Sequence, residues 1–205
     1  MKRKDFYFFR HGETDLNVRG VWQGCGSDVL LNANGMKQAQ MLAMKIKNIP
    51  FTGLYCSSML RAIQTVNIVT QNILYPQSFT VYPGLCECNF GIAEGMTFDE
   101  SKEKFGKELV FDILNPTWDT WNLSFPGGES KHEVFERVMN SLTDIIEKAC
   151  YYQDEKMCVG IVCHAGVLSA MECGLGLKNV SYDNCSILHL ECEDFNVQNL
   201  KQVVD

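Results

Sequence analysis

Short apolar runs alternate with helix-like patterns along most of this chain of 205 residues. Each run is too short for a helix and ends in a polar or glycine-containing turn, which is typical of buried strands. Four such strands are expected, at residues 6–9, 54–56, 79–82 and 157–163. Strands that alternate with helices favour a mixed, mostly parallel sheet covered on both faces. The sequence therefore predicts an α/β fold of three layers, α/β/α, in a single domain that spans residues 1–205.

The remaining elements are predicted from apolar periodicity and from capping residues. A helix is expected from Asn34 until Pro50, because apolar residues recur there at close to 3.6 residues and proline ends helices. Ser57 and Ser58 are suited to cap a second helix that continues to about Val69. Four further helices are expected at about 98–105, 107–114, 130–150 and 166–174, and two terminal strands at 186–192 and 196–203.

Charge and composition exclude several classes of function. The formal net charge is −7, which disfavours nucleic-acid binding, because contacts to a phosphate backbone need clustered lysine and arginine. No apolar stretch approaches the ~20 residues of a membrane span, and no signal peptide is visible. We therefore expect a cytoplasmic protein with neither nucleic acid nor membrane as a partner. Its ten cysteines are expected to be reduced, mostly buried thiols, since disulfide frameworks are typical of short secreted chains.

Polar residues follow three of the predicted strands at the point where each strand ends. Arg10 and His11 come directly after the first strand. Ser57 comes directly after the second strand, and Arg61 lies about one turn into the helix that follows. His164 comes directly after the strongly apolar fourth strand. Sites in open α/β sheets form where strands end, and guanidinium groups and helix N-termini suit a phosphate or carboxylate.

A carboxylate supplies a fourth signal. Glu87 lies in the loop 85–95 among apolar and small residues. A carboxyl group in such surroundings is suited to general acid catalysis, while the imidazole of His11 can act as a base or a nucleophile. The four signals together predict an anion-binding catalytic site.

The motifs, in this order and at these separations, resemble those of the histidine phosphatase superfamily, in the branch of cofactor-dependent phosphoglycerate mutase. The family's Arg-His-Gly-Glu-Thr/Ser is present at 10–14, with its asparagine as Asn17. Four further motifs are present: Ser-Ser-x-x-Arg-Ala-x-Gln-Thr at 57–65, Leu-x-Glu-x-x-x-Gly-x-x-Glu-Gly at 85–95, Pro-Gly-Gly-Glu-Ser at 126–130 and His-Ala/Gly-Gly at 164–166. The resemblance covers nearly the whole chain and implies a phosphoglycerate-mutase-like fold.

The resemblance also implies a role for each residue. His11 would be the nucleophile that forms a phosphohistidine, and Glu87 the general acid and base. Arg10, Arg61 and His164 would hold the phosphoryl oxygens. The implied substrate-binding residues are Asn17, Thr14, Gln23, Gly24 and Ala165. No metal ion or other cofactor is implied, because two arginines and a second histidine carry out the electrostatic role.

A phosphomonoesterase that acts on a small phosphorylated substrate is favoured over a mutase. In the resembling mutases, extra basic residues line the mouth of the pocket, and a longer insertion follows the glutamate motif. Here the segment at about 91–130 is compact and holds only three basic residues, and Val21 stands where the mutases carry an arginine. The loop 23–31 has one additional residue relative to the family pattern, with leucine in place of proline. Phosphoglycerate mutase activity is the alternative.

The same segment is rich in aromatic residues, which are expected either to pack in the core or to form a cap that favours an apolar or aromatic substrate, with Trp118 and Trp121 as the better candidates for the cap. A function of another class is also open. The chain could be a catalytically inactive binding protein, or one regulated through Cys86, Cys88 or Cys163, which adjoin predicted catalytic residues. The sequence leaves open the physiological substrate and the choice between a monomer and a homodimer.

Overall fold

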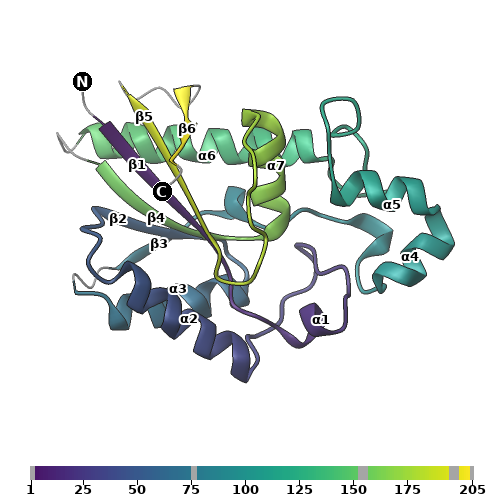
Figure 1. The fold of residues 1–205 in the computed structure, drawn as a ribbon, viewed down its shortest axis with the longest axis horizontal. Coiled ribbons are helices and arrows are strands. Elements are labelled where there is room, and N and C mark those ends of the chain that lie inside the picture. Colours follow the sequence, from purple (N-terminus) through teal and green to yellow (C-terminus); the bar gives the residue numbers. More distant parts are fainter. Residues whose placement is uncertain (1–2, 75–77, 152–156, 194–198, 204–205) are drawn as a thin grey trace.

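A six-stranded sheet forms the centre of the described part of the chain (Figure 1). The computed structural model describes residues 3–74, 78–151, 157–193 and 199–203. The strands are β1 (Arg3–Arg10), β2 (Gly53–Cys56), β3 (Phe79–Val81), β4 (Met157–Cys163), β5 (Ile187–Glu193) and β6 (Lys201–Gln202). Their order is β3-β2-β4-β1-β5-β6, in which the first four are parallel and the last two antiparallel to their neighbours. The predicted mixed, mostly parallel sheet is confirmed.

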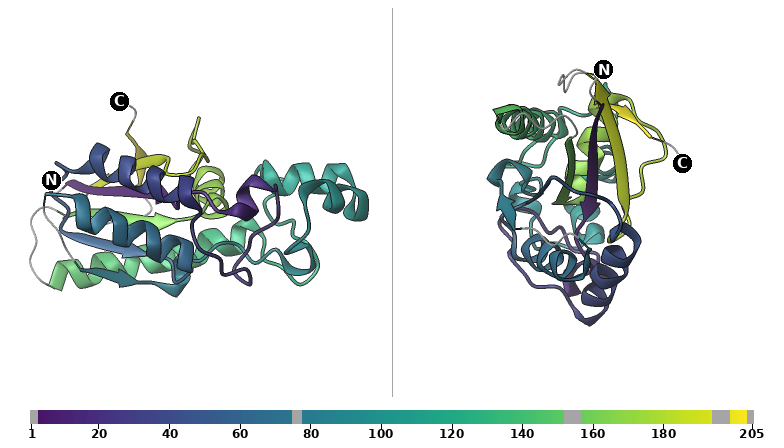
Figure 2. Two further views of the ribbon diagram at one scale, coloured as in Figure 1. Left: turned by 90° about the horizontal axis from the view of Figure 1, so that it is seen from below. Right: turned by 90° about the vertical axis from the view of Figure 1, so that its left-hand side faces the viewer.

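Helices cover both faces of this sheet, which confirms the predicted three layers (Figures 1 and 2). The α-helices are α1 (Asp15–Val18), α2 (Ala33–Ile46), α3 (Leu60–Asn72), α4 (Phe98–Phe105), α5 (Lys107–Leu114), α6 (Lys131–Tyr151) and α7 (Ala165–Leu175). On β1, Phe9 packs in the cluster with α2 and α3, whereas Phe6 and Phe8 pack in the cluster with α6 and α7. Both faces of β1 are therefore apolar, because alternate residues point to opposite helix layers. No described helix combines the length and apolarity that crossing a bilayer requires.

The start of α3 differs from the prediction. Its N-cap is Met59 rather than Ser57 or Ser58, and no side chain caps it. The Ser57 hydroxyl accepts a hydrogen bond from the Met59 N–H and is joined to the ring of His164 at 2.7 Å. Ser57 therefore links two strand ends instead of capping the helix.

Short elements and the chain end also depart from the prediction. The four-residue helix α1 and the 3-10 helices at Pro83–Leu85 and Gly91–Ala93 were not expected, since so few residues show no periodicity. Within the predicted terminal strand 196–203, only the two residues of β6 form a strand, and residues 196–198 lie outside the described residues.

The predicted cap segment, 91–130, carries α4 and α5 beyond the ends of the strands (Figure 1). Trp22 joins it to the loop after β1. The indole Nε1–H donates to the hydroxyl of Ser101 at 2.8 Å, and the ring packs edge-on against Phe98 and Phe125 at centroid distances of 4.9 and 5.0 Å. A shared aromatic core thus fixes the segment against the site-forming loop.

Two backbones cross closely where the chain leaves β1. A Cβ atom added at Gly12 would overlap the carbonyl group of Gly35, and one added at Gly35 would overlap the backbone of Glu13. The same crossing is held by hydrogen bonds from Asn32, whose N–H donates to the Glu13 carbonyl and whose side-chain amide donates to the Glu13 carboxylate, both at 2.9 Å. The start of α2 therefore sets the position of the loop that carries His11.

Gly35→Ala is expected to destabilise the protein, although alanine is normally preferred to glycine inside a helix by about 0.5–1 kcal/mol. The added methyl group meets backbone that cannot move aside, and overpacking of this kind costs about 1–3 kcal/mol. Urea denaturation measures the change. Gln40→Ala, on the exposed side of the same helix, is the control and should alter stability by less than about 0.5 kcal/mol. A gain in stability for Gly35→Ala would show that the crossing is not tight.

Candidate active site

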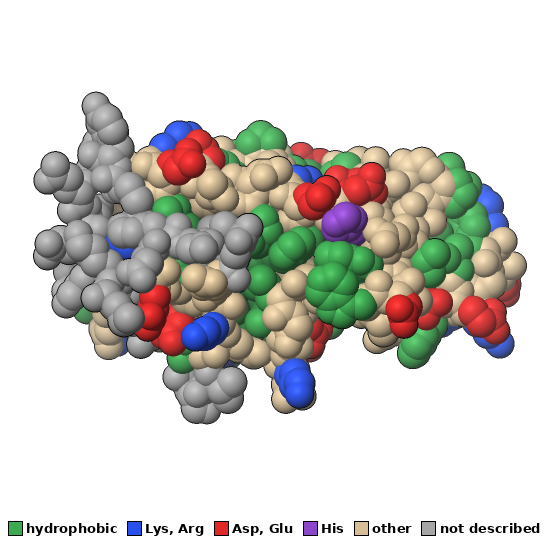
Figure 3. Space-filling view, turned by 90° about the horizontal axis from the view of Figure 1, so that it is seen from above, with side chains coloured by type: hydrophobic (Ala, Val, Ile, Leu, Met, Phe, Trp, Pro, Cys, Tyr) green, Lys and Arg blue, Asp and Glu red, His purple; other side chains and the backbone are tan. Residues whose placement is uncertain are grey.

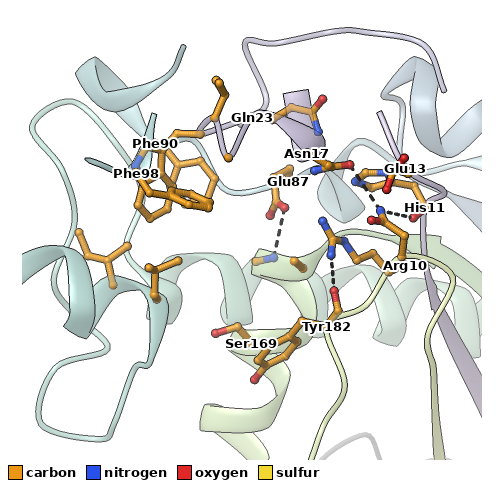
Figure 4. A pocket seen from close by; sticks show the side chains of 18 of the residues that line it. Arg10, His11, Glu13, Asn17, Gln23, Glu87, Phe90, Phe98, Ser169 and Tyr182 are labelled. Carbon is orange, nitrogen blue, oxygen red and sulfur yellow. Dashed lines mark hydrogen bonds between the residues drawn. The ribbon is translucent and has the colours of Figure 1, made fainter. Parts of the chain in front are cut away.

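Three strand ends meet at one edge of the sheet. β1 and β4 pair in parallel with Arg10 opposite Cys163, and β2 pairs with β4 so that Cys56 lies opposite Val162. The residues that follow these strands therefore come together, as parallel pairing requires. A cavity of about 400 Å³ opens beside this edge (Figure 4).

His11 is buried at the base of this cavity. Its Nδ1 lies 2.6 Å from the carbonyl oxygen of Gly12. A carbonyl can only accept, so Nδ1 carries the hydrogen and Nε2 keeps its lone pair. Burial, followed by the nearby charges of Arg10 and Arg61, lowers the pKa of His11 well below its ordinary value of 6.5. The ring is therefore neutral at pH 7 and presents a free basic nitrogen.

A second histidine faces the first. The rings of His11 and His164 are 5.2 Å apart between centroids. His164 is fully buried, its Nε2 bonds Ser57, and its Nδ1 has no hydrogen-bond partner among the described residues. Burial, then the charge of Arg61, lowers the pKa of His164 well below 6.5. His164 does not itself line the cavity, but its neighbours His11 and Ala165 do. A buried polar atom without a partner is costly, which favours a ligand group within reach of Nδ1.

Each of the two arginines also has a buried nitrogen without a hydrogen-bond partner among the described residues. Arg10 donates from one terminal nitrogen to the carbonyl of Tyr182, while its Nε has no partner in the described structure. Arg61 is fully buried and donates to the carbonyls of Gln23, Gly24 and Ser27, yet its Nε also lacks a partner there. Burial lowers the pKa of both side chains, but guanidinium groups remain charged in proteins. Arg10 lines the cavity and Arg61 does not. Two buried cations with unused donors favour an anionic ligand near them.

Glu87 lies on the wall of the same cavity and is 5% exposed (Figure 4). Its carboxylate accepts hydrogen bonds from the N–H groups of Cys88 at 2.8 Å and Gly166 at 3.2 Å, the second at the start of α7. Arg137 holds the loop before it, donating to the carbonyls of Gly84, Cys86 and Glu87. The carboxylate is thus fixed in direction, and it lines the same cavity as the predicted nucleophile.

The predicted substrate-binding residues fall into two groups. Asn17, Gln23 and Ala165 line the cavity. Thr14 and Gly24 do not line it. The hydroxyl of Thr14 donates to the side chain of Gln23 at 2.9 Å, and the Gly24 carbonyl accepts from Arg61, so both are placed to position other residues.

The family model for the histidine phosphatase superfamily (branch 1) matches residues 6–204. The chain belongs to this superfamily. It is 38% identical over 207 residues to agropine synthesis reductase of Rhizobium rhizogenes, and the match covers 95% of this chain but 41% of that protein's length. It is 30% identical over 198 residues to a Hydrogenobacter thermophilus protein provisionally named phosphoserine phosphatase 2, and the match covers 93% of this chain and 91% of that protein.

A solved structure shows the same fold. Phosphoglycerate mutase from Bacillus anthracis has a TM-score of 0.84 and 24% identity, and the match covers 98% of this chain and 92% of that one. The predicted superfamily and the predicted phosphoglycerate-mutase-like fold are confirmed.

Several residues that line the cavity of this superfamily member were not predicted. They are Ser169, Tyr182, Asn184 and Lys131, with an apolar wall that includes Phe90, Phe98, Ile113 and Leu114. Asn184 donates to the carbonyl of His11 at 3.0 Å. Among these residues, only Lys131 could have been singled out from the sequence, because it directly follows the Pro-Gly-Gly-Glu-Ser motif. The others lie on irregular segments or on helix faces whose direction the sequence does not fix.

Trp118 and Trp121, the candidates for a cap over the substrate, do not have that role at the cavity found here, and the core-packing alternative holds for Trp121. Neither residue lines it. Trp121 is buried against His132 and Phe135, and Trp118 lies on Trp121 with 64% of its surface exposed. Exposed apolar surface of this kind is also visible on the face of the molecule that carries α6 and α7 (Figure 3).

Two of the three candidate thiols near the site, Cys88 and Cys163, are poorly suited to regulation, whereas Cys86 is half-buried with its Sγ 3.0 Å from the hydroxyl of Ser58. Burial raises the pKa of Cys88 to about 12 and raises that of Cys163 further, so neither readily forms a thiolate. The nine cysteines whose side chains are described are free thiols, and Cys25 is the exposed one among them. The side chain of Cys150 lies outside the described residues. The described cysteines agree with the expectation of reduced, mostly buried thiols.

The neutral histidines make stability depend on pH in a defined direction. Below about pH 6.5 the unfolded chain takes up protons on His11 and His164, whereas the folded chain does not. The free energy of unfolding should therefore fall between pH 7.5 and 5.5, by about 1.4 kcal/mol for each histidine.

Urea denaturation at the two pH values measures this loss. His11→Asn should remove about half of it, and His132→Asn, at a half-exposed histidine, should keep it. An equal loss in wild type and His11→Asn would mean that His11 protonates normally in the folded protein.

Proposed function

We propose that this histidine phosphatase hydrolyses small phosphate monoesters through a phosphohistidine on His11, without a metal ion. The observation that carries the proposal is the neutral His11, whose Nδ1 is held by the Gly12 carbonyl so that Nε2 keeps its lone pair, near the charges of Arg10 and Arg61 and the ring of His164. Each of these three neighbours has one buried nitrogen without a partner in the described structure. The names of its relatives, which include phosphoserine phosphatase, support the same reaction class.

The first step transfers the phosphoryl group to the enzyme. Nε2 of His11 attacks phosphorus, the bond from phosphorus to the ester oxygen breaks, and protonated Glu87 gives its proton to the leaving oxygen. The Gly12 carbonyl accepts from Nδ1 and stabilises the positive charge that develops on the ring. The guanidinium groups of Arg10 and Arg61 balance the charge on the phosphoryl oxygens.

The second step releases phosphate. The Glu87 carboxylate takes a proton from a water molecule, whose oxygen attacks phosphorus while the bond to His11 breaks. The products are inorganic phosphate and the starting forms of both side chains. The backbone donors that fix the Glu87 carboxylate keep it directed at the same position in both steps.

Mutase activity is the second candidate, because the fold is shared with phosphoglycerate mutase. A mutase would return the phosphoryl group from His11 to a second hydroxyl of its substrate instead of to water. The two activities are separated by whether inorganic phosphate is released.

Phosphate release from a panel of phosphate monoesters, with a chelator present, tests the proposal. Wild type should release phosphate, and His11→Ala should lose at least about 10³-fold in kcat/KM, since removing a nucleophile is among the most costly changes to an enzyme. Glu87→Gln should lose about 10²–10⁴-fold on alkyl phosphates and much less on 4-nitrophenyl phosphate, whose leaving group needs no proton.

Glu103→Gln, at an exposed carboxylate of α4, is the control and should match wild type. Acid-labile labelled phosphate on the rapidly quenched enzyme should be absent from His11→Ala. Release that the chelator abolishes, or that survives in His11→Ala, would contradict the mechanism. Transfer to 3-phosphoglycerate without phosphate release would favour the mutase, and inactivity of the wild type in both assays would favour a binding protein.

A further inference from the structure

Lys131 is a buried cation whose position the fold does not explain. It is the first residue of α6, it lines the cavity, and it is 5% exposed. The N-terminus of a helix carries a partial positive charge, so a cation there is disfavoured. Among the described residues its ammonium group has no carboxylate partner, and its recorded contact is with the ring of Phe90, whose centroid lies 5.3 Å away.

The carboxylates on neighbouring segments are engaged elsewhere. Glu129 pairs with Arg137, and Glu133 accepts from the backbone and hydroxyl of Ser130 at the start of the helix. Glu94 accepts from the backbone of the loop that follows Gln23. Glu87 lines the same cavity, but its carboxylate accepts from the N–H groups of Cys88 and Gly166. A positive charge on a largely buried side chain without a carboxylate within ion-pair distance is costly, which favours a ligand that supplies one.

A second polar group on the cavity wall also lacks a partner. Ser169 is 5% exposed, and its hydroxyl has no hydrogen-bond partner among the described residues. It lies on α7 about one turn beyond Ala165 and Gly166, which line the same cavity (Figure 4). A buried hydroxyl normally finds a partner, so this one indicates a polar group on the bound molecule.

The rest of the wall away from His11 is apolar. Phe90 and Phe98 line it together with Ile113 and Leu114 of α5. An apolar wall with a few polar groups is typical of a site that holds the body of a small molecule and fixes its orientation.

We propose that the substrate is a phosphate monoester whose alcohol part has an apolar, ring-sized body and carries a second anionic group, which pairs with Lys131. This inference rests on the proposed function and adds the substrate class. The phosphoryl group would lie against His11 and Arg10, the body against the phenylalanine rings, and the second anion at the start of α6. Lys131 is then a specificity-determining residue.

Paired aryl phosphates test the proposal. The ring carries a carboxylate directly, or one or two methylene groups away, and each acid is compared with its uncharged primary amide. Wild type should prefer at least one acid over its amide by about tenfold or more in kcat/KM, because a charge-assisted hydrogen bond is strong. Lys131→Met should reduce this ratio to about one, and Lys131→Arg should keep most of it.

Lys148→Met, near the other end of α6, is the matched control and should leave the ratio unchanged. Calorimetric binding of the corresponding aryl phosphonates, which cannot be hydrolysed, separates the two proposals. If the protein bound the acid more tightly than the amide but hydrolysed none of the esters, the proposed phosphatase activity would be rejected and the proposed role of Lys131 would stand. The proposed role of Lys131 would be overturned if acid and amide were hydrolysed and bound equally well at every spacer length. It would also be overturned if Lys131→Met left a preference for the acid unchanged.

Discussion

The parallel pairing of β1, β4 and β2 is the constraint on which the site depends. Three strands that end at the same edge deliver Arg10 and His11, His164, and Ser57 to one place, although these residues are far apart in the chain. Ser57 then joins two of the strand ends through its hydrogen bond to His164. The strand pairing and this hydrogen bond fix where the three strand ends lie relative to one another, and the phosphoryl transfer proposed above would depend on such positioning.

Some charged groups of the site have all their hydrogen-bond partners within the described part of the protein, whereas others do not. Arg137 is almost fully used, since its three nitrogens donate to three carbonyls and to Glu129. By contrast, Arg10 and Arg61 each keep a buried nitrogen without a partner in the described structure. The ammonium group of Lys131 lies over the ring of Phe90 rather than beside a described carboxylate. This contrast distinguishes residues that maintain the loop conformation from residues that are suited to contact a ligand.

Much of the fold and the centre of the site could be predicted from the sequence. Apolar runs and helical periods gave the layers, and the helices 98–105 and 107–114 coincide with α4 and α5. The wall of the cavity could not be predicted, because it depends on which faces of α5 and α7 turn inward. Aromatic content alone pointed to Trp118, yet tertiary packing placed Phe98 at the cavity and left Trp118 on the surface. The position of Lys131 at the cavity could not be predicted either, since a lysine in a polar helical turn is normally exposed.

Arg61 connects the cationic centre of the site to a loop that forms part of the cavity wall through Gln23. Its guanidinium donates to three carbonyls of the segment 23–27, the same loop that carries one additional residue relative to the family pattern. A change in the length of that loop would therefore also shift the arginine that is proposed to balance phosphoryl charge. Adaptation to a new substrate through this loop is coupled to catalytic rate, whereas the opposite wall, built from α5 and the start of α6, can vary without moving Arg61. We therefore expect divergence in substrate choice to accumulate on that wall.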